Sequence, residues 1–322
     1  MRAEIDGEST PDEWDRLAVG LGGGCFHSDA GAKAEAALGG EPLRIRFVHG
    51  GATVGAVTGA VTRTRPRLLG RWRDRISLGT APLLAPGTDP SLLGPALLEL
   101  GRRLGVKGIA VETYDAPGYL LDGRTILGGP RQDSRVEFRL ALSPDWESVL
   151  AAMSTGHRRN LRKAQKMGLD VRRLTGFASA QTVRELQEGT FDRRKELGHH
   201  HAHQMDAATY ERVLRIWMSR GGESWVAYRQ DEPVSGIVIT RLGDRSYYLV
   251  GGTSRAGFAC HAPFAVFGEV LATLGKDGCR ELNLGGVPKA AEESAHPDHG
   301  LFRFKRDFGA KTLALHSETV RL

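Results

Sequence analysis

Cysteines and long apolar runs are what this sequence has least of. Cys25, Cys260 and Cys279 are its three cysteines, and no two of them have the CxxC spacing of a thiolate zinc site. Their odd number also argues against a disulfide framework. No apolar run approaches the about 18 residues that span a membrane, and residues 1–8 lack the apolar core of a signal peptide. We therefore expect a reduced, cytoplasmic, soluble protein with no membrane partner and no obligate protein partner.

Length, composition and charge describe an ordinary globular protein with a basic bias. Hydrophobic residues make up 40% and charged residues 25% of the 322 residues. A chain of this length exceeds one usual core, so we expect two domains. The net charge of +6 and the pI near 9.4 are compatible with an anionic partner. They fit a mildly basic enzyme without such a partner equally well.

The first part of the chain reads as a mixture of helices and strands. Thr10 followed by Pro11 and two acids predicts the start of a helix. Gly50 and Gly51 lie between two β-prone runs, which predicts a hairpin. Leucines at helical spacing predict a helix over residues 90–104. The expected strands are residues 43–48, 53–62, 109–111 and 136–142. This alternation predicts an α/β protein.

A second domain is expected to begin after Ser143. The helical patterns there cover residues 154–166, 182–197, 207–218 and 263–277. The β-prone runs cover residues 224–228, 234–240, 246–250 and 282–286. Helices, then three consecutive strands, then a helix and one more strand is the element order of the GNAT (acyl-CoA N-acyltransferase) fold.

Five short motifs, in this order along the chain, give the sequence a family likeness. They are Gly156-His-Arg-Arg-Asn-Leu-Arg-Lys-Ala-Gln-Lys-Met-Gly168, Tyr247-Tyr248 with Gly251-Gly252, Cys260-His-Ala-Pro-Phe-Ala-Val266, Leu282-Asn-Leu-Gly-Gly-Val287 and Phe302-Arg-Phe-Lys-Arg-Asp-Phe-Gly309. Together they resemble the Fem-type transferases, and most closely the FemX-like branch. The resemblance covers residues 140–322 well and the N-terminal part loosely.

This resemblance implies two tandem GNAT-like domains. The first would span residues 1–143, joined by a tail of about residues 310–322, and the second residues 144–309. Such enzymes move an amino acid from aminoacyl-tRNA to an amine. The resemblance therefore implies aminoacyl-tRNA and a small-molecule amine acceptor as partners, and no further cofactor.

Five cations share one face of the predicted helix over residues 154–166. Arg158, Arg162 and Lys166 recur at intervals of four, and Arg159 and Lys163 fill the adjacent row. Like charges stacked in this way repel, so the helix would gain by binding an anion. The phosphates of an RNA acceptor stem would suit it. The alternative is a solvated helix face.

The resemblance assigns the chemistry to Phe304 and Lys305. An acceptor amine attacks the aminoacyl carbonyl, and a fixed cation near the oxygen stabilises the negative charge that develops there. The resemblance gives this role to Lys305 and a supporting, packing role to Phe304. The local sequence alone would describe an ordinary lysine on a turn. No general base stands out, and a ribose hydroxyl of the tRNA could relay the proton.

The acceptor is expected to contact the loop that follows the helix over residues 182–197. Residues 199–203 hold four histidines, which invites a metal site, but no carboxylate or thiolate partner is obvious and we predict none. The resemblance instead implies acceptor contacts from His201, His203 and Tyr210, and more loosely from Lys33 in the first domain.

Two departures from the family pattern point to an unusual acceptor. No arginine occupies residues 202–208, where the FemX-like branch grips a diphosphate, and Val250 stands where a family tyrosine is expected. Nearby cations could replace the missing charge, namely Arg193, Arg194 and Lys195. We expect an antibiotic-type peptide or amino sugar as the acceptor, with a peptidoglycan precursor as the alternative.

Two other functions remain open from the sequence. Residues 253–259 resemble the loop that binds the acyl-CoA pyrophosphate in GNAT enzymes, which would make the protein an acyl-CoA N-acyltransferase. Arg255 lies one residue too close to Gly257 for that pattern, so coenzyme A ranks second. The third possibility is a non-catalytic RNA-binding module.

Overall fold

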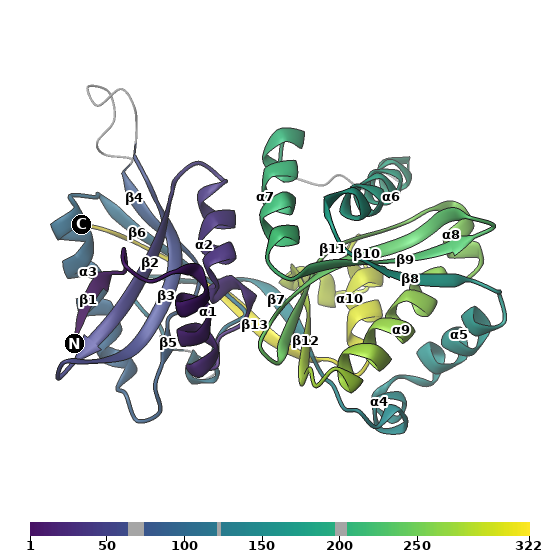
Figure 1. Cartoon of the computed structure of the whole chain (residues 1–322), viewed down its shortest axis with the longest axis horizontal. Helices are drawn as coiled ribbons and strands as arrows, with labels where there is room; N and C mark the ends of the chain where they lie inside the picture. The colour runs from purple at the N-terminus through teal and green to yellow at the C-terminus, as the bar shows by residue number, and fades with distance from the viewer. Residues whose placement is uncertain (64–73, 121–123, 197–204) are drawn as a thin grey trace. The chain divides into compact units, whose positions relative to one another are not determined.

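The computed structural model describes residues 1–63, 74–120, 124–196 and 205–322, and the chain divides into two compact units (Figure 1). Unit 1 comprises Met1–Glu137 together with Leu313–Leu322, and unit 2 comprises Phe138–Thr312. The division falls inside two strands, β7 (Arg131–Ala141) and β13 (Lys311–Arg321). The sequence placed the boundary slightly later, at Ser143, because proline and a new helix start follow there.

Unit 1 is built on a sheet with the strand order β1-β2-β3-β4-β6-β13, and β5 pairs with β3. Strands β4 and β6 are parallel, and their pairing runs from Arg75 opposite Gly108 to Thr80 opposite Tyr114. The last strand of the chain pairs antiparallel with β6. The strands are β1 (Arg2–Ile5), β2 (Glu41–His49), β3 (Ala52–Thr62), β4 (Arg75–Thr80), β5 (Leu83–Leu84) and β6 (Gly108–Tyr114).

The described part of unit 1 contains three α-helices. They are α1 (Pro11–Gly20), α2 (Asp29–Ala36) and α3 (Leu93–Leu104), with short 3₁₀ turns at Cys25–His27, Pro90–Leu92 and Gly118–Leu120. The predicted helix start at Thr10 is confirmed, because its side chain accepts from the Glu13 N–H. Leu93, Leu97 and Leu100 of α3 are buried among the apolar residues of the sheet.

Strand β13 also carries a buried carboxylate that holds a loop of unit 1. The two oxygens of Glu318 accept hydrogen bonds from the N–H groups of Ile126 and Leu127, at 2.7 and 2.8 Å. Nε2 of His316 lies 3.0 Å from Glu318 Oε1. Burial alone would raise the pKa of Glu318, but these hydrogen bonds outweigh it and hold the pKa below its usual value.

Unit 2 has the strand order β7-β12-β11-β10-β9-β8. Strands β8 to β11 pair antiparallel in sequence, whereas β11 and β12 are parallel. The strands are β8 (Asp170–Leu174), β9 (Gly222–Arg229), β10 (Glu232–Leu242), β11 (Arg245–Thr253) and β12 (Glu281–Pro288). The edge strand β8 was not predicted, because its three charged residues among five hide any apolar alternation.

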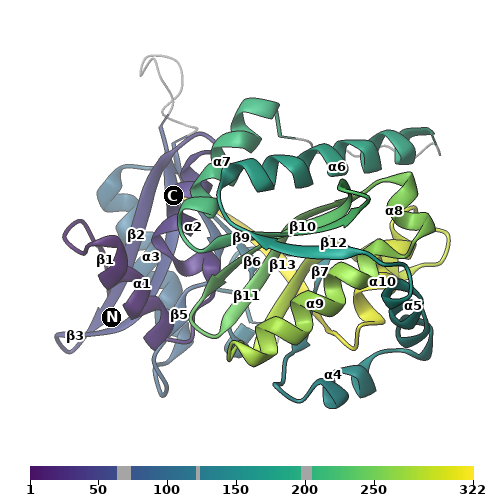
Figure 2. The ribbon, with the colours of Figure 1, turned by 45° about the vertical axis from the view of Figure 1, so that its right-hand side comes forward.

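Helices cover both faces of the unit 2 sheet (Figure 2). They are α4 (Trp146–Ala152), α5 (Thr155–Gln165), α6 (Phe177–Glu196), α7 (Ala207–Ser219), α8 (Arg255–Ala259), α9 (Ala262–Lys276) and α10 (His299–Arg306), with a 3₁₀ turn at Lys289–Glu292. Helix α6 lies directly against β11, because a Cβ on Gly252 would come within 2.1 Å of the Gln187 nitrogen. Helix α9 covers the other face, over β8, β9 and β10.

Helix α10 was not predicted from its sequence. Its cations and aromatics alternate along the chain, which does not read as an amphipathic helix. The buried residues are nevertheless Phe302, Lys305 and, just beyond the helix, Phe308, which recur at intervals of three. That is helical spacing, and it was hidden because one of the three is a lysine.

Across the described ranges, none of the helices is both long enough and apolar enough to cross a membrane.

The buried Glu318 generates a prediction about stability. The pKa of Glu318 is lowered in the folded state. Its contribution to the free energy of unfolding is therefore fully present above the usual pKa of 4.5 and is lost as the pH falls through the lowered pKa. Glu318→Gln leaves one N–H of Ile126 or Leu127 without an acceptor. We expect about 1–3 kcal/mol less free energy of unfolding at pH 7, and a difference from wild type that shrinks in acid.

Urea unfolding at pH 7 and pH 3.5 measures this change, and amide exchange at Ile126 and Leu127 localises it. Glu99→Gln, an exposed carboxylate on α3, is the control. Unchanged stability at pH 7 in Glu318→Gln would show that the carboxylate does not hold the loop.

Candidate active site

Helix α10 places Lys305 inside unit 2 rather than on its surface. The lysine is only 6% exposed. Its Nζ lies 5.5 Å from the ring centroid of Tyr248 on β11 and 6.0 Å from that of Phe138 on β7. The faces of these rings attract a cation, so the ammonium group is held between two strands that lie far apart in the sequence.

Gly285 brings the backbone of β12 close to the same ammonium group. Its φ of +69° lies in the left-handed region, and Asn283 Oδ1 accepts its N–H at 2.9 Å. A Cβ at this position would lie 3.4 Å from Tyr247 Oη and 3.7 Å from Lys305 Nζ. The hydroxyl of Tyr247 and the ammonium of Lys305 therefore both face the α-carbon of Gly285.

The parallel strands β11 and β12 separate at this point. Their pairing runs from Arg245 opposite Glu281 to Tyr247 opposite Asn283, and both strands continue beyond it. Parallel strands that part at their carboxyl ends present backbone groups that are not used within the ladder, and ligands of α/β proteins bind at such ends. Lys305, Tyr248 and Gly285 surround this place.

Burial controls the protonation of two phenols of unit 2, those of Tyr248 and Tyr210. It raises the pKa of Tyr248, with a smaller contribution from Tyr210, and it raises the pKa of Tyr210 to about 12. Both hydroxyls are therefore protonated and uncharged near neutral pH. The Tyr210 hydroxyl donates to Gln187 Oε1 at 3.0 Å, and the Arg184 guanidinium lies 4.1 Å from the Tyr210 ring centroid. Tyr210 thus joins α7 to α6.

Phe304, the residue before Lys305, belongs to a cluster of aromatic rings. Its ring centroid lies 5.6 Å from that of Phe264, 5.5 Å from that of Phe267 and 5.1 Å from that of Phe308. These pairs have the edge-to-face arrangement that aromatic rings favour. The packing role predicted for Phe304 fits this surrounding.

The same cluster receives His157 from α5. His157 is buried, and its Nε2 lies 3.0 Å from the carbonyl oxygen of Phe304. Burial lowers the pKa of His157, although the Phe304 carbonyl and Asp307 partly oppose that effect. The imidazole is therefore neutral near pH 7. Because a carbonyl can only accept, the proton is assigned to Nε2.

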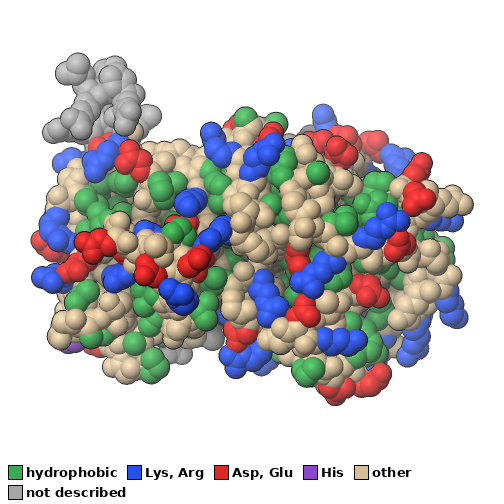
Figure 3. Space-filling model, viewed as in Figure 1, with side chains coloured by type: hydrophobic (Ala, Val, Ile, Leu, Met, Phe, Trp, Pro, Cys, Tyr) green, Lys and Arg blue, Asp and Glu red, His purple; other side chains and the backbone are tan. Residues whose placement is uncertain are grey.

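Four of the five predicted phosphate-binding cations lie on α5, on the side that faces away from α9, and the fifth, Lys166, is the residue that ends the helix. His157, Leu161 and Ala164 form the buried face of this helix, whereas Arg159, Arg162, Lys163 and Lys166 are exposed and Arg158 is half-buried. Within the described part of the chain none of the five pairs with a carboxylate, and Arg158 donates only to the Thr155 hydroxyl. Lysine and arginine side chains gather at the edge where Figure 1 places α5 (Figure 3).

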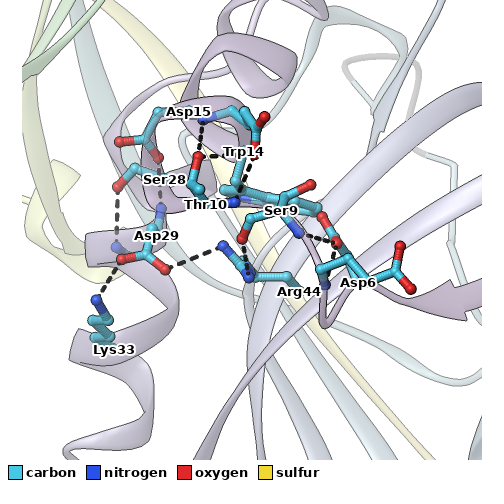
Figure 4. A network of polar contacts seen from close by, with 12 residues as sticks. Asp6, Ser9, Thr10, Trp14, Asp15, Ser28, Asp29, Lys33 and Arg44 are labelled. Carbon is cyan, nitrogen blue, oxygen red and sulfur yellow. Dashed lines mark hydrogen bonds and ion pairs between the residues drawn. The ribbon is translucent and has the colours of Figure 1, made fainter.

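Lys33 lies in unit 1, on α2, and is already paired. Its Nζ is 2.6 Å from Asp29 Oδ2, one turn earlier on the same helix (Figure 4). The other oxygen of Asp29 lies 3.4 Å from Arg44 Nη1. Arg44 in turn donates to the carbonyl of Ser9. The lysine is therefore one end of a polar network that ties α2 to the start of α1.

Of the other predicted acceptor residues, His201 and His203 lie outside the described residues. In the described ranges no group of three or more His, Cys, Asp or Glu side chains is placed to hold a metal ion. Two of the three cations proposed to replace the family arginine have partners: Arg194 pairs with Asp298, and the guanidinium of Arg193 lies 4.2 Å from the ring centroid of Phe258.

The segment that resembles a coenzyme A loop is held against its own sheet. The N–H of Ser254 donates to the Val234 carbonyl at 2.9 Å, and the N–H of Gly257 donates to Ser254 Oγ at 3.1 Å. A Cβ on Gly257 would come within 2.1 Å of the Val234 oxygen. The backbone N–H groups of Ser254 and Gly257 are therefore both engaged within the protein.

Sequence reasoning missed four residues of this site: Phe138, Tyr248, Gly285 and His157. Tyr248, Gly285 and His157 fall inside the motifs that carry the family likeness, but residue type gave them no role. Phe138 had no signal beyond its place in a predicted strand, because its contact with Lys305 depends on the pairing of strands far apart in the sequence.

Known proteins resemble this chain in fold. Residues 152–306 match the family model Acetyltransf_6, described as an acetyltransferase (GNAT) domain. The crystal structure of FemX superposes with a TM-score of 0.76 at 14% identity, covering 98% of this chain and 97% of that one. A search of the curated proteins found no match.

Two further solved structures are also similar in fold. The C-terminal domain of a putative lysylphosphatidylglycerol synthetase from Agrobacterium fabrum has a TM-score of 0.57 at 14% identity, over 96% of this chain and 92% of that one. The structure of L-PGS from Bacillus licheniformis has a TM-score of 0.55 at 12% identity, over 98% and 92%. The predicted fold class is therefore confirmed: the chain is an α/β protein of two tandem GNAT-like domains with the fold of FemX.

Proposed function

We propose that this protein is an aminoacyltransferase that takes an amino acid from aminoacyl-tRNA and forms an amide with the amine of a small molecule. The observation that carries the proposal is the buried ammonium of Lys305, held beside Gly285 where β11 and β12 separate. The fold shared with FemX supports it. The putative lysylphosphatidylglycerol synthetase of similar fold is named for an aminoacylated product, which is compatible with it.

The reaction is the aminolysis of an ester. The acceptor nitrogen bonds to the aminoacyl carbonyl carbon, and negative charge moves to the carbonyl oxygen. Lys305 stabilises that charge by donating from its ammonium group. The carbon–oxygen bond to the tRNA ribose then breaks, and the ribose oxygen takes the proton that the amine loses. The ester is already activated, so the protein needs positioning more than a cofactor, and none is proposed.

The donor would be held by its phosphates. The cations concerned lie on α5 or directly at its end and have no carboxylate partner among the described residues; they are Arg158, Arg159, Arg162, Lys163 and Lys166. Such cations bind RNA without regard to sequence and release condensed counterions when they do so. An enzyme that uses aminoacyl-tRNA works where translation supplies it, so we place the activity in the cytoplasm.

The acceptor is proposed to be an antibiotic-type peptide or an amino sugar. A diphosphate needs fixed, free cations, but Lys33 is paired with Asp29 and Arg194 with Asp298. Tyr210, His201 and His203 stay as predicted acceptor contacts. The peptidoglycan-precursor alternative requires the diphosphate to be held by other groups.

A second candidate is an acyl-CoA N-acyltransferase, which the GNAT acetyltransferase match over residues 152–306 favours. The engaged N–H groups of Ser254 and Gly257 argue against it.

We expect the purified protein to transfer the amino acid of charged tRNA to amine acceptors and to leave acetyl-CoA unused. Radiolabelled aminoacyl-tRNA and radiolabelled acetyl-CoA are each supplied with a panel of amino sugars, amine-bearing peptides and UDP-muropeptide, and amide products are separated by chromatography. Transfer from acetyl-CoA alone would establish the second candidate. Binding of tRNA without any transfer would leave an RNA-binding module, and efficient use of UDP-muropeptide would overturn the proposed acceptor.

Lys305→Ala is expected to lower kcat by roughly 10²-fold or more, because the developing oxyanion loses its charged donor. The tRNA affinity should stay within twofold of wild type, because the phosphate contacts lie on α5. Single-turnover transfer measures the chemical step. Lys276→Ala removes a cation from the end of α9 as a control. Wild-type turnover in Lys305→Ala would remove this lysine from the mechanism.

Replacing Arg158, Arg159 and Arg162 together by Gln should raise KM for aminoacyl-tRNA and leave the acceptor KM unchanged. Each phosphate contact that is lost should reduce the slope of log K against log salt by roughly 0.7–0.9. Filter binding at several salt concentrations gives the slope. The matched control replaces three exposed cations of unit 1, Arg16, Arg102 and Lys107, by Gln. An unchanged slope in the α5 variant would mean that these arginines form a solvated face.

A further inference from the structure

The first turn of α5 is hydrogen-bonded to α10 on both sides of Lys305. The Nε2–H of His157 donates to the carbonyl of Phe304, the residue before the lysine, at 3.0 Å. The N–H of Ser154 donates to the carbonyl of Asp307, two residues after it, at 2.9 Å. Both carbonyls belong to the last turn and end of α10, whose carbonyl groups have no partner within the helix. Helix α5 therefore supplies the partners that α10 lacks.

The imidazole of His157 is fixed by its surroundings. Its ring centroid lies 5.0 Å from that of Phe264, 5.5 Å from that of Phe304 and 4.6 Å from that of Phe308. Ser154 Oγ accepts the His157 N–H at 3.2 Å and lies 3.4 Å from Nδ1. A ring held by three aromatics and by polar contacts at both nitrogens has no room to change rotamer.

The rest of α5 is equally well anchored. Leu161, one turn further along, packs so closely on α9 that a Cβ on Gly268 would come within 2.6 Å of it. The exposed cations of α5 follow His157 directly in the sequence and lie on the opposite side of this contact. The helix thus has one side that holds α10 and another that is free to bind phosphate.

We propose that His157 is a positioning residue that fixes the Lys305 ammonium relative to the phosphate-binding face of α5. The proposal rests on the proposed function. A tRNA that binds α5 through its phosphates is then at a set distance and orientation from the ammonium group that must meet its ester carbonyl. Helices α5 and α10 then act as one rigid unit, so the tRNA that binds α5 also has its ester carbonyl placed near Lys305. This lowers the entropic cost of reaching the transition state.

A purely structural role for His157 predicts a different outcome. A buried histidine that only supports the fold would, when replaced, lower stability and reduce activity in proportion to the protein lost. A positioning residue predicts a loss in the chemical step with tRNA binding intact. It also predicts recovery by a side chain that restores the one hydrogen bond.

Two substitutions separate these roles. His157→Phe keeps a ring in the aromatic cluster but cannot donate to the Phe304 carbonyl, whereas His157→Gln places an amide N–H close to the position of Nε2. We expect His157→Phe to lower the single-turnover rate constant for transfer by roughly 10- to 100-fold. KM for aminoacyl-tRNA should stay within twofold of wild type and the slope of log K against log salt should be unchanged. His157→Gln should recover most of the loss in rate.

Val226→Ala on β9 is the control for stability, because Val226 is fully buried in a cluster formed with α6 and α7. Its thermal midpoint is compared with those of the His157 variants, and kcat is measured at a temperature where all are folded. Wild-type kcat in His157→Phe, an equal loss in Val226→Ala, a changed salt slope or no recovery in His157→Gln would each overturn the positioning role.

The choice of donor by the wild-type protein tests the proposed function separately from the role of His157. If it does not use charged tRNA but transfers from acetyl-CoA, the proposed function fails. The same variants are then compared with acetyl-CoA as the donor. A loss in kcat with recovery in His157→Gln would keep His157 as the residue that positions Lys305, and unchanged kcat would refute it.

Discussion

An ammonium group withdrawn from water is the constraint on which the candidate site depends. Removing a charge from water costs several kcal/mol unless the surrounding groups replace the hydration it loses. Around Lys305 the ring faces of Phe138 and Tyr248 come from β7 and β11, and Gly285 brings the backbone of β12 close to the same ammonium group. Strands β7, β11 and β12 must therefore be correctly paired before the lysine can take its place, and the aromatic cluster behind α10 keeps it there.

The two units differ in how far their parallel strand pairing extends. Each contains a parallel pair of strands followed by a helical segment. In unit 1 the pairing of β4 with β6 continues across an irregularity to Thr80 and Tyr114, at the ends of both strands. In unit 2 the pairing of β11 with β12 stops at Tyr247 and Asn283, well before either strand ends. The two parallel pairs therefore differ in how far their pairing runs toward the carboxyl ends of the strands.

The sequence predicted the fold wherever residue type and spacing agreed. Leucines three or four apart predicted α3, glycines predicted the hairpin of β2 and β3, and the run of strands and helices predicted the α/β class. It failed at α10 and β8, where charged residues occupy positions that apolar residues usually mark. The cations of α5 stood out by their helical spacing, whereas Lys305 could be singled out only through the family likeness. The groups that surround Lys305 could not be predicted from the sequence, because their contacts join segments that are distant along the chain. His157 and Phe304, for example, are 147 residues apart.

The return of the last strand to unit 1 has a consequence for synthesis on the ribosome. Unit 2 is one continuous segment, whereas unit 1 needs Leu313–Leu322 to complete its sheet and to cover the N–H groups of Ile126 and Leu127. Domains generally fold as they emerge, the N-terminal one first. Here the order is reversed at the final step: unit 1 must wait, with an open strand edge beside β6, until all of unit 2 has been translated. An open edge is a template for pairing with other chains, so a nascent chain that stalls within unit 2 is exposed to aggregation through its N-terminal unit.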